Sequence, residues 1–161
     1  MLWVMRAGQK AIYFDKFMND SKIYLPWEGY HFPLDCYNDV ADFRKIVIAE
    51  RNPDNRTTIS NWSGQLFSFV CGMKLGDYVL IPEKLSHSYC LAKVSGTYQF
   101  VQDDVDGLFH ARPIETVAES IPRDIFSRSI QYSLGAFRTI FKVKSEDEVI
   151  TTISAWKERK L

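Results

Sequence analysis

Short strand-like segments stand at both ends of this 161-residue sequence, and helix-like segments lie between them. The strand-like segments alternate apolar and polar residues, or are rich in β-branched and aromatic residues, and turn residues bound them. They cover residues 2–7, 22–27, 76–82, 88–100 and 111–119, with one more strand within 132–143. Strands interrupted by helices in this way predict an α+β fold, in which helices flank a small, strongly curved sheet or barrel.

Apolar residues at intervals of three and four predict the helices. They cover residues 11–20, 39–50, 57–72 and 145–160, with a short helical turn within 121–127. The expected N-caps are Asn38 or Asp39 for the second helix, Thr57 or Thr58 for the third, and Ser145 for the last. No internal repeat or low-complexity linker divides the sequence, so we expect a single domain over residues 1–161.

The composition disfavours several classes of protein. Hydrophobic residues make up 46% of the chain, as in a folded globular protein. No apolar run approaches the roughly 18 residues that span a bilayer, and the amino end lacks a secretory pattern, so we expect a cytoplasmic protein with no membrane partner. The three cysteines are widely spaced, which favours buried thiols over disulfides or a zinc site. Basic and acidic residues balance at 20 each, so nucleic-acid binding would depend on a local patch and a pocket.

The predicted helix over residues 57–72 carries two kinds of side chain. Its apolar stripe, which is typical of a helix on a core, continues just past the helix and consists of Ile59, Trp62, Leu66, Phe69 and Met73. The adjoining face presents Asn61, Gln65 and Ser68. Gly64 lies in the middle of the helix, where glycine costs about 1 kcal/mol relative to alanine. This cost indicates either a function for the polar face or a close packing contact at the glycine.

Three stretches resemble one known family in their order along the chain. They are WVMRAG at residues 3–8, NWSGQLFSFVCGMKLGDYVLIPEK at 61–84 and SLGAFRTIFKV at 133–143. Together they resemble the N-terminal domain of Mrr-type and McrBC-type modification-dependent restriction endonucleases. That resemblance implies a PUA-like fold related to the EVE and YTH domains, whose members hold a modified or extruded base in an aromatic pocket.

The nuclease part of such enzymes has no counterpart in this sequence. Its metal site contains a Glu-x-Lys triplet, and the only such triplet here, residues 158–160, lies in the predicted terminal helix. A nuclease needs carboxylates and a lysine that converge on bound metal. We therefore expect a binding domain without catalysis, metal or cofactor, which works with a restriction nuclease or motor in the same protein or another subunit.

The resemblance implies a base-binding cage between the aromatic loop after residue 26 and the polar face of the helix over 57–72. The candidate residues are Trp27, Glu28, Tyr30, Asn61, Trp62 and Gln65. Stacking a base on an aromatic wall is worth roughly 1–3 kcal/mol, and amides or a carboxylate can pair with its polar edge. Structural roles stay open: Trp27 can cover the sheet edge, Trp62 can belong to the core, the amides can cap loops, Gly64 can accommodate a packed strand, and Glu28 can be solvated.

A phosphate-binding patch is expected between residues 123 and 138. Arg123, Arg128 and Arg138 stand there against a single acid, Asp124, with aromatic residues between them. Arginines suit phosphate oxygens, although ion pairs with acids elsewhere explain the same residues. The three histidines accompany no Asp or Cys at triad or metal spacing, so we expect structural or surface roles for them.

These patterns favour a reader of modified bases, which binds DNA, flips a methylated base into the cage and directs a restriction or defence system to foreign DNA. An RNA- or tRNA-binding module of the PUA type is the alternative. An enzyme acting on nucleobases is disfavoured, because the sequence contains no recognisable nucleophile, dyad or metal cluster. The identity of the base stays open among 5-methylcytosine, 5-hydroxymethylcytosine and 6-methyladenine.

Overall fold

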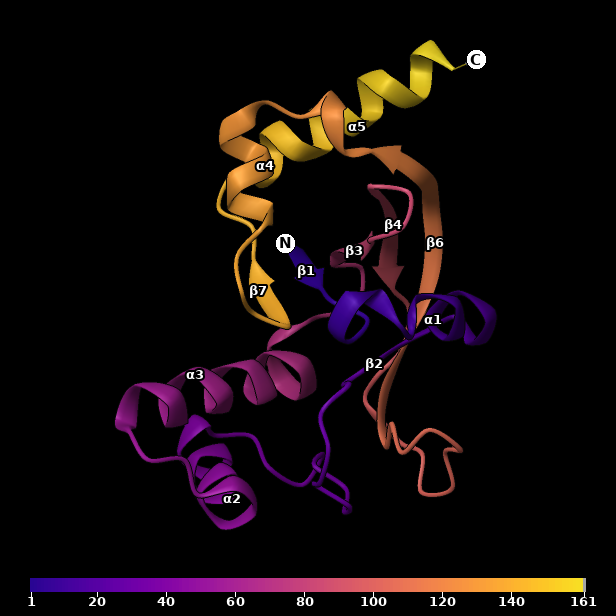
Figure 1. Ribbon diagram of the computed structural model, residues 1–161. Helices are drawn as coiled ribbons and strands as arrows, with labels where there is room; N and C mark the ends of the chain where they lie inside the picture. The colour runs from indigo at the N-terminus through magenta and orange to yellow at the C-terminus, as the bar shows by residue number, and fades with distance from the viewer. Residues whose placement is uncertain (161) are drawn as a thin grey trace.

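The computed structural model describes residues 1–160 and has an α+β architecture (Figure 1). The strands are β1 (Leu2–Met5), β2 (Lys22–Tyr24), β3 (Tyr78–Glu83), β4 (Ser88–Val94), β5 (Gln99–Phe100), β6 (His110–Pro122) and β7 (Ile140–Lys142). The helices are α1 (Phe14–Asp20), α2 (Val40–Arg51), α3 (Arg56–Phe67), α4 (Arg128–Leu134) and α5 (Glu146–Arg159). Three short helical turns accompany them: η1 (Gln9–Ala11), η2 (Ser68–Gly72) and η3 (Arg123–Ile125).

The strands form one mixed sheet in the order β2-β6-β4-β3-β1-β7, and β5 pairs with the start of β6 on the edge opposite β2, since Ala111 pairs with both Tyr24 and Gln99. The pair β1 and β3 is parallel, whereas the remaining pairs are antiparallel. The order joins the two ends of the chain, because β1 lies between β3 and the late strand β7. The segment before β7 is thereby brought next to α3, which precedes β3.

The sheet is strongly curled into a half-barrel, and β6 is the strand that bends most visibly (Figure 1). It runs for 13 residues and pairs with both β2 and β4. The register between β4 and β6 shifts on both sides of Leu91, and Ser120 has a left-handed φ of 53°. Such irregularities bend a strand and increase its twist, which accounts for the curl.

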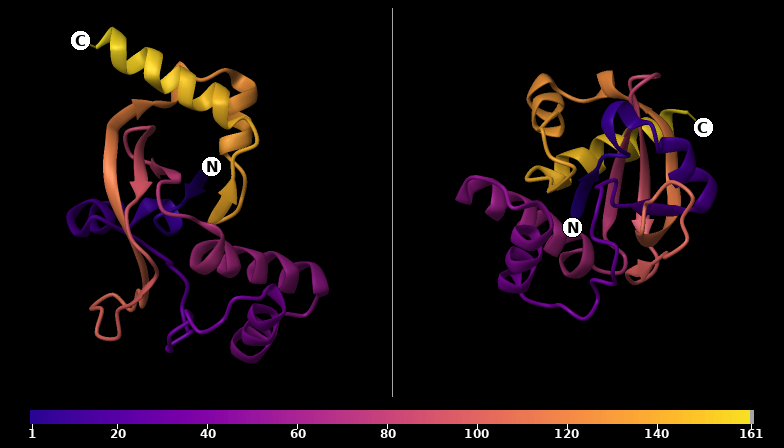
Figure 2. Two further views of the ribbon diagram at one scale, coloured as in Figure 1. Left: turned by 180° about the vertical axis from the view of Figure 1, so that it is seen from behind. Right: turned by 60° about the horizontal axis from the view of Figure 1, so that its bottom comes forward.

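Side chains of the central strands alternate between two buried clusters on the two faces of the sheet. In β1, Leu2 and Val4 belong to one cluster, and Trp3 and Met5 belong to the other. Helices α4 and α5 complete the first cluster, while α1, α2 and α3 complete the second. Figure 2 shows α4 with α5 and α2 with α3 as two separate groups around the sheet. Burial on both faces explains why β1 is apolar throughout.

The expected α+β class and curved sheet are confirmed, whereas one predicted strand needs correction and helix α4 was not expected. The strand expected over residues 88–100 is interrupted after Val94, and only Gln99–Phe100 resumes pairing, on the other side of the turn at Gly96. The segment 132–143 is strand only at Ile140–Lys142, because α4 occupies Arg128–Leu134. Ser127 caps that helix by accepting a hydrogen bond from the backbone N–H of Ile130 at 3.2 Å.

One expected helix cap is wrong, and another is correct in position but makes no capping bond. Asn55, and not Thr57 or Thr58, begins α3, since its side-chain oxygen accepts from the backbone N–H of Thr58 at 2.8 Å. Ser145 stands at the start of α5 but its hydroxyl makes no capping bond. The three acids that follow it favour a helix start through the helix dipole. Within residues 1–160, no helix is long and apolar enough to cross a membrane.

Candidate functional site

A pocket of about 400 Å³ lies where four segments of the chain meet. The loop between β2 and α2, the end of α2, the middle of α3 and the segment between α4 and β7 each supply part of its wall. The lining residues are Trp27, Tyr30, Arg51, Asn61, Trp62, Gln65, Phe137, Arg138 and Thr139. Five of the six predicted cage residues therefore line one pocket, although they are up to 38 positions apart in the sequence, from Trp27 to Gln65.

Glu28 is the predicted cage residue that does not line the pocket. Its side chain is exposed, and its backbone carbonyl accepts a hydrogen bond from Arg51 Nη2 at 2.8 Å. This bond holds the Arg51 guanidinium at the pocket mouth. Sequence reasoning missed Arg51, Phe137 and Thr139, although Phe137 and Thr139 belong to the stretch that carries the family resemblance.

Trp27 and Trp62 are each half-buried and pack against the larger core cluster with one part of the ring system. The ring centroids of Trp27 and Tyr30 are 6.4 Å apart, and the planes of the two rings make an angle of 42°. Its indole N–H donates to Thr139 Oγ1 at 3.1 Å, which ties the loop to the segment before β7. Each tryptophan thus serves the core and the pocket wall together, so the two interpretations of these residues do not exclude one another.

Tyr30 is held in a strained backbone conformation at the pocket wall. Its φ is 53°, in the left-handed region that non-glycine residues seldom adopt, and Gly29 before it has a φ of 85°. The carbonyl of Tyr30 accepts from His110 Nε2 at 2.7 Å, and its N–H lies 3.4 Å from a carboxylate oxygen of Glu50. These contacts from β6 and α2 stabilise the strained residue.

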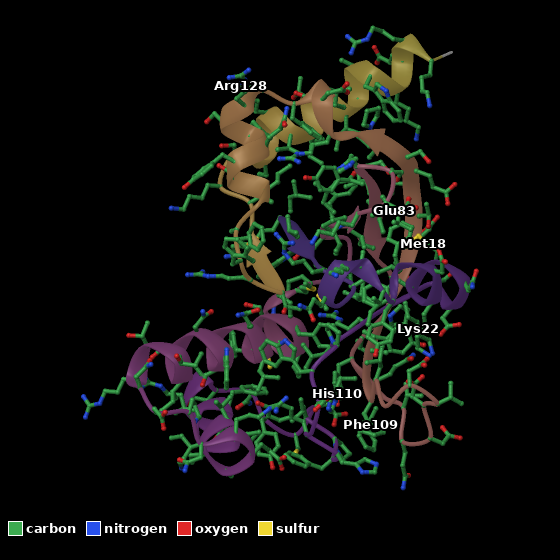
Figure 3. All side chains as sticks on the ribbon, in the orientation of Figure 1. Met18, Lys22, Glu83, Phe109, His110 and Arg128 are labelled. Carbon is green, nitrogen blue, oxygen red and sulfur yellow. The ribbon has the colours of Figure 1, made fainter. Side chains whose placement is uncertain are left out.

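His110 links the sheet to this loop by a hydrogen bond to the backbone of Tyr30. It is buried at the start of β6, as Figure 3 illustrates, and burial lowers its pKa to about 4. The neutral ring donates through Nε2 to Tyr30, so Nδ1 must accept from the hydroxyl of Tyr98. Tyr98 in turn accepts from the backbone N–H of Leu34 at 3.1 Å. His110 thus has the structural role expected of the histidines, at a position that fixes the pocket wall.

Gln65 has a structural role in the pocket. Its side-chain oxygen accepts from the backbone N–H groups of Thr139 and Ile140, at 3.0 and 3.1 Å. Its Nε2 donates to Asn61 Oδ1 at 2.9 Å. The expectation that an amide of α3 caps a neighbouring loop therefore describes Gln65, while Asn61 keeps its own NH₂ group free of hydrogen bonds within residues 1–160.

Gly64 does not accommodate a packed strand. A Cβ atom added at this position would meet nothing within 4 Å. The residue instead lines a second hollow of about 700 Å³, between α3 and the strands β1 and β7, which shares Asn61, Gln65 and Arg138 with the first pocket. The absence of a side chain at Gly64 keeps this hollow open.

The three predicted phosphate-binding arginines lie apart. Arg138 lines the pocket, and its backbone carbonyl accepts from Arg6 Nε at 3.0 Å, so the segment that carries it is fixed. Arg123 lines a separate hollow beside the turn between β3 and β4. Arg128 stands at the first residue of α4, away from α3 (Figure 3). Only Arg138 is therefore placed to act together with the pocket.

The pocket offers stacking surfaces and hydrogen-bond donors. Among the residues that the structure describes, no three His, Cys, Asp or Glu side chains come together as a metal site. The lining contains no carboxylate, thiol or histidine. The arrangement suits a flat ligand that is bound between aromatic rings.

No curated protein and no solved structure gives a significant match to the chain. One family model does match, over residues 3–144. The match runs from β1 to just past β7, so it contains every residue that lines the pocket, and it leaves out α5. The chain therefore belongs to the family described as Domain of unknown function (DUF8426).

Proposed function

We propose that this protein is a nucleic-acid-binding module that holds one extruded, modified base in the pocket between α3, the loop after β2 and the segment before β7. The observation that carries the proposal is the convergence of Trp27, Tyr30 and Trp62 with Asn61 and Arg138 around one pocket. The volume of about 400 Å³ falls in the range of small-ligand sites. Aromatic side chains suit the faces of a base, and an arginine at the mouth suits a flanking phosphate.

The resemblance to modification-dependent restriction enzymes supports DNA as the polymer and a methylated base as the ligand. On this proposal the fold is PUA-like, and the module directs a nuclease or motor in a restriction or defence system. On this proposal the module does not cleave DNA itself, which fits a pocket lined by no carboxylate, thiol or histidine. RNA binding by a PUA-type module is the competing outcome.

One binding experiment tests this proposal. The affinity of the purified protein is measured for one oligonucleotide sequence as unmodified DNA, as DNA with a central methylated base, and as RNA. We expect the methylated DNA to bind most tightly, and tightest binding of RNA would support the alternative. The double variant Trp27→Ala, Trp62→Ala is expected to lose the preference, whereas Tyr132→Ala, which removes an exposed aromatic ring on α4, is expected to keep it.

Two outcomes contradict the proposal. One is that none of the three oligonucleotides binds. The other is that the double variant remains folded, by circular dichroism and melting temperature, and discriminates among the oligonucleotides as the natural protein does.

A further inference from the structure

We propose that the pocket selects a base that presents hydrogen-bond acceptors, such as a keto or carboxyl oxygen, over one that presents an amino group at the same place. This inference rests on the proposed function and ranks ligands within it: modified bases with an added oxygen acceptor bind more tightly than methylated bases that present only an amino group at that place. The evidence is whether each polar group in the pocket wall is left free to donate or to accept a hydrogen bond.

The orientation of Gln65 is fixed by the backbone. Two N–H groups, those of Thr139 and Ile140, point at one atom of its carboxamide, at 3.0 and 3.1 Å. An N–H group can only donate, so that atom must be the oxygen. The other end of the carboxamide is consequently the NH₂ group, and it lies 2.9 Å from the side chain of Asn61.

The orientation of Asn61 follows from that of Gln65. The atom that receives the NH₂ group of Gln65 must be an acceptor, so it is Asn61 Oδ1. The remaining end of Asn61 is therefore its NH₂ group, a donor that makes no hydrogen bond within residues 1–160. The backbone N–H groups of Thr139, just before β7, and of Ile140, its first residue, thus determine that the free end of the Asn61 amide is a donor.

Most of the remaining free polar groups in the wall are donors only, and the hydroxyl of Tyr30 can both donate and accept. The guanidinium of Arg138 and the indole N–H of Trp62 make no hydrogen bond in the described part of the chain, and Arg51 uses only one of its nitrogens, on the carbonyl of Glu28. The hydroxyl of Tyr30 is buried without a partner, in a residue only 1% exposed. The guanidinium of Arg51 lies close enough to this hydroxyl to offset part of the rise that burial causes in its pKa.

Each side-chain amide or threonine oxygen in the wall already receives a hydrogen bond. Gln65 Oε1 receives two N–H groups, Asn61 Oδ1 receives one, and Thr139 Oγ1 receives the indole N–H of Trp27. The acids next in sequence to Trp27 and Arg51 do not line the pocket, since Glu28 is exposed and Glu50 faces the N–H of Tyr30. An amino group brought here would meet mainly donors and would have to share an acceptor already in use or bond to the hydroxyl oxygen of Tyr30, whereas a ligand oxygen would find several free donors.

The test uses two matched pairs of bases at the central position of one oligonucleotide. Hypoxanthine carries a keto oxygen where adenine carries the exocyclic amino group, and its N1 is protonated where that of adenine is an acceptor. The base 5-carboxylcytosine carries a carboxylate in place of the methyl group of 5-methylcytosine, and both keep the exocyclic amino group. Competition binding measured by fluorescence anisotropy is expected to favour the acceptor-bearing member of each pair by about tenfold or more.

The variant Asn61→Asp tests the group that we regard as decisive. Aspartate keeps the acceptor for Gln65 Nε2 and replaces the free NH₂ donor by an acceptor of the same shape. We expect it to remove or reverse the preference for hypoxanthine over adenine. Asn19→Asp, at an exposed position of α1, makes the same charge change away from the pocket and should leave the preference intact.

The outcomes separate this inference from the proposed function. If no oligonucleotide binds, both are overturned. If binding depends on Trp27 and Trp62 but the members of both pairs bind equally, only this inference is overturned. If Asn61→Asp leaves an existing preference unchanged, Asn61 is not the group that selects the base. Should that variant fail to fold, the natural protein decides the question through its affinities for the two matched pairs of oligonucleotides.

Discussion

The indole N–H of Trp27 donates a hydrogen bond to the hydroxyl oxygen of Thr139 at 3.1 Å, across 112 positions of sequence. The bond joins the loop after β2 to the segment before β7, and both line the same pocket. Because each is an irregular segment, their relative position depends on a few such contacts. The bond therefore helps to set the width of the pocket.

Replacing Trp27 tests its place in the wall. Trp27→Ala removes one stacking face and is expected to weaken base binding by about 1–3 kcal/mol while the protein still folds. Isothermal titration and thermal melting measure the two effects. If Trp27 served only the core, its truncation would instead cost roughly 3–5 kcal/mol of stability. A large fall in melting temperature, or a folded variant with unchanged discrimination, would contradict the assignment.

Thr139→Val isolates the hydrogen bond from the stacking surface. Valine keeps the shape of threonine but cannot accept from Trp27 Nε1. We expect a stability loss of about 0.5–1.5 kcal/mol, the usual net value of one hydrogen bond, and a smaller loss of binding than for Trp27→Ala. An affinity loss equal to that of Trp27→Ala would mean that the position of the ring, rather than its surface, controls binding.

Gln65 is expected to matter for stability. Gln65→Leu leaves the N–H groups of Thr139 and Ile140 without an acceptor, at about 1–3 kcal/mol for each buried group. Gln65→Glu keeps that acceptor and should be milder. Urea unfolding measures both variants. A Gln65→Leu protein as stable as the natural one would show that water reaches these groups.

Gly64→Ala is expected to stabilise the protein by up to about 1 kcal/mol, because alanine is the better helix former and its Cβ meets no neighbour within 4 Å. Gly96→Ala is the matched control and is expected to reduce stability. Its Cβ would stand 2.6 Å from Cγ of Pro113, a rigid ring, and such overpacking typically costs 1–3 kcal/mol. Urea midpoints that move in the same direction would contradict this account of Gly64.

Stability should depend on pH through His110. Its folded pKa is about 4, against 6.5 for an unperturbed histidine, so folding favours the neutral ring. The contribution is complete above pH 6.5, declines as the pH falls toward 4, and amounts to at most about 3 kcal/mol. Burial raises the pKa values of Asp77 and Asp104, but hydrogen bonds to their carboxylates lower them more, so both pKa values lie below 3.8. Protonation of these two acids therefore reduces stability only at a pH below the range in which His110 acts.

Two measurements check the role of His110. Urea unfolding between pH 4 and 7 should show the decline in the natural protein and a flatter profile in His110→Gln. Imidazole signals followed by NMR should place the pKa of His110 well below 6.5. A pKa of His110 near 6.5 would exclude this mechanism.

The sequence predicted the fold class and named five residues that line one pocket, because both depend on local patterns and on a recognisable string of residues. Strands and long helices repeat their apolar residues at fixed intervals, whereas α4 is too short for a clear period and depends on Ser127 as a cap. The orientation of the Asn61 side-chain amide could not be predicted, because it follows from a hydrogen bond between Gln65 and the backbone 74 positions away.

Buried polar residues were the least predictable part. Arg112 lies in β6 and donates to the carbonyls of Met73 and Gly96, at 2.6 and 3.1 Å, where the chain leaves η2 and where β4 ends. His110 supports Tyr30 in a similar way. Periodicity marks such residues only as polar, because their partners are backbone carbonyls far along the chain.

The separation of the three arginines leads to the last prediction. Arg138 lines the pocket, whereas Arg128 stands at the outer end of α4, so only the first should meet a phosphate next to the bound base. Arg138→Ala is expected to weaken oligonucleotide binding and to make the log–log salt slope shallower by about 0.7–0.9, the value for one phosphate contact. Arg128→Ala is the control and should leave affinity and slope unchanged. The natural protein should give a slope no steeper than about −6, because few cations stand near the pocket. Equal effects of the two variants would mean that the strand extends over α4, and a steeper slope would require a second basic surface.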